Sequence, residues 1–215
     1  MITSGRMRTI IVARDAILGP IKNKPVQLPD GTILSPTSTE ENKLFGLWKV
    51  HFELSKDLGK TWSKIEPAPV ALEKTIQAIQ PSILFHDNNK LQALGRSKGG
   101  KIFETWSALS YTNLPNPNSG TDAVTLKNGT HLLVYNHTEK GRSPLNLGIS
   151  KDGKTWEAAL VLEKDPGEYS YPAIIQTADG MVHITYTWKR LRVRHLMIDP
   201  SMLSGKAIIG GEWPK

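Results

Sequence analysis

The chain of 215 residues contains no cysteine, which excludes a disulfide framework and a thiolate zinc site. It has no apolar run of the roughly 18 residues that a membrane-spanning helix needs. The apolar run at 10–13 is too short for the core of a secretory signal. We therefore expect a soluble protein with no evident signal peptide, of unknown compartment. The histidines show no metal-ligand spacing, so we expect no metal and no cofactor.

The positive charge of the chain is scattered. Lys and Arg exceed Asp and Glu by 7, yet the only dense basic cluster is KRLRVRH at 189–195. There Arg190, Arg192 and Arg194 alternate with apolar residues, which predicts one solvated face of a β-strand. No nucleic-acid-binding motif accompanies the cluster. We expect neither nucleic acid nor a membrane as a partner.

The most informative feature is a repeated pattern of strand, polar turn and strand. The four copies are PVQLPDGTILSP at 25–36, PSILFHDNNKLQAL at 81–94, DAVTLKNGTHLLVY at 122–135 and PAIIQTADGMVHITY at 172–186. Their turn residues, Gly31, Asn89, Gly129 and Gly180, lie 58, 40 and 51 residues apart, within or near the spacing of propeller blades. Together with the near absence of helical periodicity, this predicts an all-β fold of four-stranded antiparallel sheets.

A second repeat lies between these hairpins, as SKDLGKTW at 55–62 and SKDGKTW at 150–156. An Asp side chain can accept hydrogen bonds from the backbone amides that follow it, and Gly can occupy a left-handed turn position. The closing Trp can then pack under the next strand. Each copy should fold a β-hairpin, and 104–114 is a degenerate middle copy that lacks the Asp and Gly.

This second repeat resembles the Asp-box of the sialidase superfamily, S-x-D-x-G-x-T-W. The matching residues are Ser55, Asp57, Gly59, Thr61 and Trp62 in the first copy and Ser150, Asp152, Gly153, Thr155 and Trp156 in the second. The resemblance implies a sialidase-like six-bladed β-propeller, of which about four blades can be drawn here. It places the blades at 19–200, between a non-matching segment at 1–18 and a tail at 201–215. Asp-boxes lie away from the active face, so their expected role is structural.

Two longer segments resemble those that carry arginines of the sialidase triad. ALGRSKGGKIFETWS at 93–107 is similar to the segment of the second arginine, which falls on Arg96. NHTEKGRSPLNLGIS at 136–150 is similar to the segment of the third, which falls on Arg142. The nearest counterpart of the first arginine is Lys24, in Asn-Lys-Pro, unless that segment belongs to a later blade.

A third segment, EYSYPAIIQTADGMVHITYTW at 168–188, resembles the strand that carries the sialidase tyrosine nucleophile. Counting back from the Asp-Gly turn favours Tyr171, whereas matching the Tyr-Ser pair favours Tyr169; we favour Tyr171. The family's return strand usually ends Tyr-Glu, but here Thr187 follows the tyrosine. Glu53 and Glu168 are the carboxylates that could replace the missing one.

The resemblance implies an exo-α-sialidase-like glycoside hydrolase that acts on a terminal acidic sugar. An arginine can bind a sugar carboxylate through two parallel hydrogen bonds, which a lysine cannot reproduce. A neutral tyrosine suits attack next to a carboxylate, which would repel Asp or Glu. The partner is then an acidic saccharide.

Three further residues have two interpretations each. Asp122 either faces the ligand or caps the Pro-Asn loop before a strand. Trp188 either stacks on a sugar ring or packs in the core. Arg190 follows the nucleophile strand and could hydrogen-bond a sugar.

Two other functions compete with the enzyme. Lys24 and Thr187 favour a non-catalytic glycan-binding propeller that holds the same sugar without turnover. The second alternative is that the chain is a truncated product of a longer gene. The open blade edges of such a product predict self-association.

Overall fold

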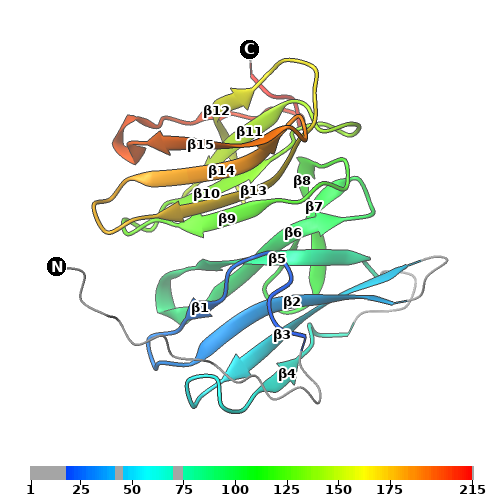
Figure 1. Ribbon diagram of the computed structural model, residues 1–215, viewed down its shortest axis with the longest axis vertical. Coiled ribbons are helices and arrows are strands. Elements are labelled where there is room, and N and C mark those ends of the chain that lie inside the picture. The colour runs from blue at the N-terminus through cyan, green and yellow to red at the C-terminus, as the bar shows by residue number, and fades with distance from the viewer. Residues whose placement is uncertain (1–17, 42–45, 70–74, 215) are drawn as a thin grey trace.

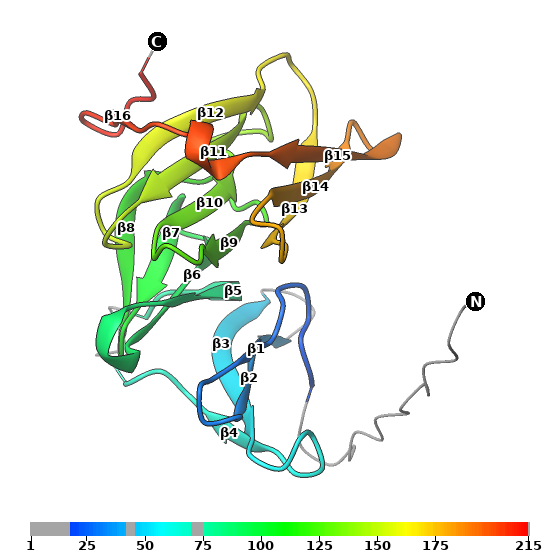
Figure 2. The same ribbon diagram turned by 90° about the vertical axis from the view of Figure 1, so that its left-hand side faces the viewer.

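The computed structural model describes residues 18–41, 46–69 and 75–214. It contains four antiparallel sheets, arranged as successive blades of a β-propeller (Figures 1 and 2). We name them blades A to D in chain order. The expected all-β, partial propeller of about four blades is confirmed. No helix in the described part of the chain is long and apolar enough to cross a bilayer.

Blades A and B each have four strands. Blade A contains β1 (Val26–Gln27), β2 (Ile33–Glu41), β3 (Leu47–Ser55) and β4 (Ser63–Ile65). Blade B contains β5 (Ala78–Phe85), β6 (Leu91–Ser97), β7 (Lys101–Thr105) and β8 (Leu109–Pro115). A short 3₁₀ turn, η2 (Asp87–Asn89), joins β5 to β6.

Blades C and D share the end of the chain. Blade C contains β9 (Asp122–Thr125), β10 (His131–Tyr135), β11 (Leu145–Ser150), β12 (Glu157–Glu163) and the late strand β16 (Lys206–Ala207). Blade D contains β13 (Tyr169–Gln176), β14 (Val182–Trp188) and β15 (Arg192–Ile198). After β15 the chain passes through η3 (Pro200–Met202) and returns to pair β16 with β12, at the outer edge of blade C (Figure 2).

The four predicted hairpins are the first two strands of the four blades. In blades A, C and D the turn is closed by the glycines Gly31, Gly129 and Gly180, each at a positive φ between 84° and 90°. Blade B uses Asn88 and Asn89 there, with φ of 58° and 57°. Asn tolerates this conformation better than other residues with a side chain, so the same turn recurs with different chemistry.

The Asp-boxes fold the turns between the third and fourth strands of blades A and C, as predicted. In blade A, Asp57 Oδ1 accepts from the amides of Lys60 and Thr61, and Oδ2 accepts from the Thr61 hydroxyl. These hydrogen bonds lower the pKa of Asp57 to about 2. Burial would raise the pKa of Asp152, but equivalent hydrogen bonds, led by the Thr155 amide, lower it to about 2.

The core lies between the blades, where alternate side chains of neighbouring sheets meet. Between A and B the contacts centre on Leu34 and Ile83. Between B and C, Leu84 meets the Asp-box residue Trp156, which is 4% exposed. The largest cluster lies between C and D and includes Ile174. Each blade is therefore held by its neighbours.

The basic cluster at 189–195 does not form a single strand face, and the expected tail at 201–215 packs against blade C. Arg192 and Arg194 lie on β15, but Arg190 lies in the preceding turn at φ 55°, so the three arginines do not share one strand face. In the expected tail, Trp213 packs 5.1 Å from the ring of His137 of blade C.

Candidate functional site

The inner strands of blades B and D carry the same local irregularity. Gln80 and Tyr171 each sit at a register shift of the first strand and each precedes a proline. Their φ angles are 57° and 51°, in the left-handed region that side chains other than Gly, Asn and Asp rarely adopt. Such conformations persist where the surrounding fold enforces them and cluster at functional sites.

Tyr171 and Tyr169 lie in opposite environments. Tyr171 is 49% exposed, and the Arg142 guanidinium lies 5.5 Å from the centre of its ring. Tyr169 is 1% exposed and belongs to the core between blades C and D. Of the two candidate nucleophiles, Tyr171 is the one with a side chain that a ligand can reach.

Arg96 lies near the end of β6, opposite Ile79 of β5. Its guanidinium stacks 4.8 Å from the centre of the Trp48 ring of blade A, and the residue is 9% exposed. Burial lowers the pKa of Arg96, whereas its interaction with the Tyr171 hydroxyl acts in the opposite direction. Arg96 Nε has no hydrogen-bond partner in the described part of the chain. The structure thus brings Arg96, Tyr171 and Arg142 together.

Arg142 is fixed to blade D through Glu168. Arg142 Nη1 lies 3.3 Å from Glu168 Oε1, and Arg190 Nε lies 2.7 Å from Glu168 Oε2. The hydrogen bond from Arg190 is the main reason that the pKa of Glu168 is lowered. Arg190 is thereby connected to the site through a carboxylate. Trp188 packs against the core cluster between blades C and D, and its ring is covered by Arg192 at 4.4 Å.

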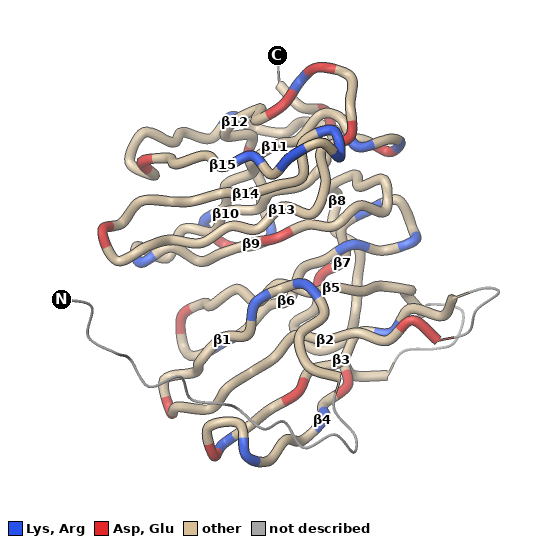
Figure 3. The backbone as a smooth tube through the Cα atoms, viewed as in Figure 1, with Lys and Arg blue, Asp and Glu red and all other residues tan. Residues whose placement is uncertain are grey.

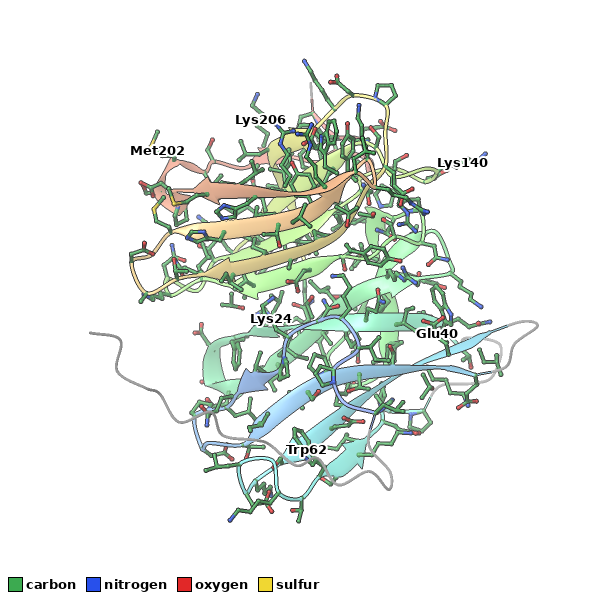
Figure 4. The ribbon with its side chains drawn as sticks, in the orientation of Figure 1. Lys24, Glu40, Trp62, Lys140, Met202 and Lys206 are labelled. Atoms are coloured by element: carbon green, nitrogen blue, oxygen red, sulfur yellow. The ribbon has the colours of Figure 1, made fainter. Side chains whose placement is uncertain are left out.

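Asp122 lies where three blades and the segment before β1 converge, and it is 3% exposed. Its Oδ1 accepts from Ser82 Oγ (2.8 Å) and Asn23 Nδ2 (3.1 Å). Its Oδ2 accepts from Lys24 Nζ (2.8 Å) and the Ile174 amide (2.9 Å). The carboxylate thus ties blades B, C and D together and fixes Lys24, which lies between the blade pairs A–B and C–D (Figure 4).

Sequence reasoning missed Lys22, Gly120 and Gln80. Lys22 Nζ donates to the carbonyls of Thr121 (2.7 Å) and Pro172 (2.8 Å), and burial lowers its pKa to about 8. A Cβ on Gly120 would lie 3.2 Å from Lys22 Cε, 3.3 Å from Tyr171 Cδ1 and 3.5 Å from Gln80 Oε1. Gly120 therefore leaves the room in which these side chains meet. The signal that could have pointed to Gln80 is its sequence context: in I-Q-P-S-I at 79–83 it precedes a proline, as Tyr171 does in S-Y-P-A-I at 170–174.

Lys and Arg also occur along the loop before β1, beside the inner strands (Figure 3). Glu53, the other carboxylate considered, is buried in blade A, where it accepts from the amides of Leu18 and Gly19. Within the described residues, no group of three or more His, Asp or Glu is placed to hold a metal ion. The charged side chains near Tyr171 are therefore mainly the cations Lys22, Arg96 and Arg142.

A hollow of about 420 Å³ lies elsewhere, between the outer parts of blades A and B. Its lining includes Leu34, Phe52 and Trp106. An apolar lining of this kind does not suit an acidic sugar, so we place the candidate site at Tyr171.

The blades and the Asp-boxes together define a partial β-propeller of sialidase-like fold. The family model for the BNR repeat-like domain matches residues 7–184. The chain belongs to the BNR repeat-like family. A comparison with curated proteins found no match.

Several solved structures share the fold. NanB sialidase from Streptococcus pneumoniae (K499G mutant) is similar at 15% identity with a TM-score of 0.66, covering 84% of this chain and 31% of that one. The intramolecular trans-sialidase from Ruminococcus gnavus is similar at 15% identity and 0.63, covering 85% and 44%. A protein of unknown function from Dyadobacter fermentans is similar at 20% identity and 0.61, covering 76% and 48%. This chain thus spans less than half the length of each, and the likeness shows the fold alone.

Proposed function

We propose that the site at Tyr171 binds a terminal acidic sugar and that this protein is a sialidase-like glycoside hydrolase. The observation that carries the proposal is the position of Tyr171, a half-exposed tyrosine on strained backbone that lies near the guanidinium groups of both Arg96 and Arg142.

The two arginines suit the carboxylate of such a sugar. Arg96 has an unpartnered Nε, and its planar group is already fixed by stacking on Trp48. A guanidinium fixed before binding loses little side-chain freedom when it forms two parallel hydrogen bonds. Arg142 is similarly held by Glu168. The carboxylate would then lie beside the tyrosine ring.

In the hydrolytic reaction, Tyr171 Oη forms a bond to the anomeric carbon while the glycosidic C–O bond breaks. The phenol proton passes to a base and the leaving oxygen gains a proton; water then displaces the tyrosine. The sequence suggested Glu53 and Glu168 as carboxylates that could take this proton. Because Glu53 accepts hydrogen bonds from two backbone amides within blade A, Glu168 is the one that remains.

The test is hydrolysis of a fluorogenic α-sialoside, and separately of a fluorogenic uronide, by the full chain. We expect turnover that is lost in Tyr171→Phe and Arg142→Ala. The matched controls are Tyr111→Phe, an exposed tyrosine on β8, and Arg192→Ala, both of which should retain activity. Turnover unchanged in Tyr171→Phe would overturn the assignment of the nucleophile.

A second candidate is a glycan-binding protein without turnover. The specific observation in its favour is that Glu168 is already paired with both Arg142 and Arg190, which lowers its pKa and weakens it as a base. A folded chain that binds N-acetylneuraminic acid through Arg142 and hydrolyses neither substrate would select this candidate.

A further inference from the structure

The turn between β14 and β15 places two cations on a backbone that disfavours them. Lys189 and Arg190 have φ angles of 51° and 55°. The Leu191 amide closes the turn by donating to the Trp188 carbonyl at 3.0 Å. A β-turn whose two central residues both have a positive φ strongly prefers Gly, Asn and Asp there. Other residues held in such sparsely populated conformations cluster at active sites and ligand clamps. The two charges therefore call for a functional explanation.

Both side chains of the turn are held in place and accessible. Lys189 Nζ lies 4.9 Å from the centre of the Trp188 ring, and its stem passes close to Gly167, where a Cβ would lie 3.0 Å from Lys189 Cε. Arg190 donates from Nε to Glu168 Oε2 at 2.7 Å, and its side chain is 73% exposed. Lys189 is partly exposed. A ligand in solution can therefore reach both cations.

Positive charge predominates at this end of blade D. Glu168 is shared between Arg190 and Arg142. Lys189 has no salt bridge to any of the described residues, so three cations accompany one carboxylate. Figure 3 shows Lys and Arg gathered where the chain turns from β14 into β15. Exposed cations that are held in place before binding attract an anion at little cost in side-chain freedom.

Glu168 joins this turn to the site at Tyr171. Its Oε1 lies 3.3 Å from Nη1 of Arg142, whose guanidinium lies 5.5 Å from the centre of the Tyr171 ring. The hydrogen bond to Glu168 raises the pKa of Arg190, and the Tyr171 hydroxyl acts in the same direction. The turn is therefore adjacent to the place proposed for the terminal sugar. A single carboxylate does not fill both places, because Glu168 lies between Arg142 and Arg190.

We propose that Lys189 and Arg190 form a second anion subsite, which binds the carboxylate of an acidic sugar linked to the terminal one. This inference rests on the proposed binding of the terminal sugar at Tyr171 and specifies its substrate class: glycans in which two neighbouring sugars are acidic. Arg96 and Arg142 bind the terminal carboxylate, and the turn binds the next one. Glycine or asparagine would suit the backbone of the turn better but would remove these charges.

The test compares two ligands by calorimetric titration. Disialic acid, which is two linked N-acetylneuraminic acids, carries two carboxylates, whereas sialyllactose carries the same terminal sugar on a neutral disaccharide. All proteins carry Tyr171→Phe, so that neither ligand is cleaved. We expect disialic acid to bind about three- to tenfold more tightly, the effect of two exposed ion pairs. This preference should shrink at high salt, because exposed charges are screened.

The variant that tests the turn is Lys189→Asn with Arg190→Gly. It removes both cations and supplies residues that the turn prefers, so we expect thermal unfolding to show a kept fold and the preference to disappear. Arg142→Ala should weaken both ligands and keep the preference. The matched control is Lys154→Asn: Lys154 Nζ also lies over an indole, 5.3 Å from the centre of the Trp106 ring. Because it belongs to the Asp-box of blade C, its loss should change neither affinity.

The outcomes separate this inference from the proposed function. A preference that survives the double change would overturn the inference, whether both affinities fall equally or neither falls. So would tight binding of an oligothymidylate that is lost with the double change and kept in Arg142→Ala, because that would indicate a general surface for polyanions. Binding of both sugars without any preference by the Tyr171→Phe parent would refute the second subsite alone, whereas binding of neither would refute the proposed function as well.

Discussion

Replacing Asp122 by asparagine should destabilise the whole chain. Five donors converge on this carboxylate: Ser82 Oγ, Asn23 Nδ2, Lys24 Nζ and the amides of Ala123 and Ile174. An asparagine side chain offers one oxygen acceptor and one NH₂ group, so at least two of the five donors would face another donor. The change therefore removes a buried charge and also creates repulsive contacts in its place.

The magnitude follows from the burial of the pair. Breaking a buried ion pair by removing one partner costs about 3–5 kcal/mol. Asp122 is almost fully buried and Lys24 is about a third exposed, so we expect the lower part of that range, about 3 kcal/mol. This is a large share of the roughly 5–15 kcal/mol that stabilises a typical domain.

Urea unfolding followed by tryptophan fluorescence measures the effect. The midpoint should fall with little change in slope, because the surface exposed on unfolding is the same. Asp179→Asn is the control: Asp179 is an exposed turn carboxylate whose contacts are local, so the change should cost little. A midpoint for Asp122→Asn within error of the parent would refute the reasoning that this carboxylate joins the blades.

Three further predictions concern other parts of the molecule. The pKa values of Asp57 and Asp152 are lowered from 3.8 to about 2, so the stability that these carboxylates contribute is present above pH 3.8 and is lost as the pH falls toward 2. Replacing both by Asn should therefore make Tm depend less on pH between 3.8 and 2. An unchanged dependence of Tm on pH would contradict this prediction. Gly120→Ala should reduce binding of N-acetylneuraminic acid with little change in Tm, because a Cβ there would lie 3.2 Å from Lys22 Cε and 3.3 Å from Tyr171 Cδ1 and both side chains must shift slightly. Calorimetric titration measures the loss of binding, and thermal unfolding shows whether the fold is kept. One face of blade D carries Ile175, Val193 and Met197, which are 46%, 71% and 62% exposed, so the chain should self-associate through this face. Val193→Lys should then lower the apparent molecular mass measured by light scattering, and a monomeric parent protein would refute the prediction.

Local patterns in the sequence predicted much of the fold. The Asp-boxes are decided by hydrogen bonds within a few residues, as between Asp57 and Thr61, so their hairpins could be inferred from the residues alone. Asn88 and Asn89 likewise indicated a turn, because they tolerate the required backbone conformation.

The candidate site was less predictable, because its residues come from distant segments. Lys22 contacts the Pro172 carbonyl 150 residues away, and no local pattern announces such a contact. The choice between Tyr169 and Tyr171 depends on which side of β13 faces the core, and a register shift at that point changes the alternation. Asp122 was equally ambiguous, since a strand-initiating carboxylate and one that joins three blades look the same in sequence.

The return of the chain to blade C limits how copies of this protein can join. β16 pairs with β12 at Glu157 and Ala158 and so covers one end of the outer edge of blade C. Among the described strands, the outer edges that remain are β4, β8 and β15. A strand from another molecule could therefore add along the outer edges of blades A, B and D, whereas on blade C the protein's own chain already occupies the beginning of that edge.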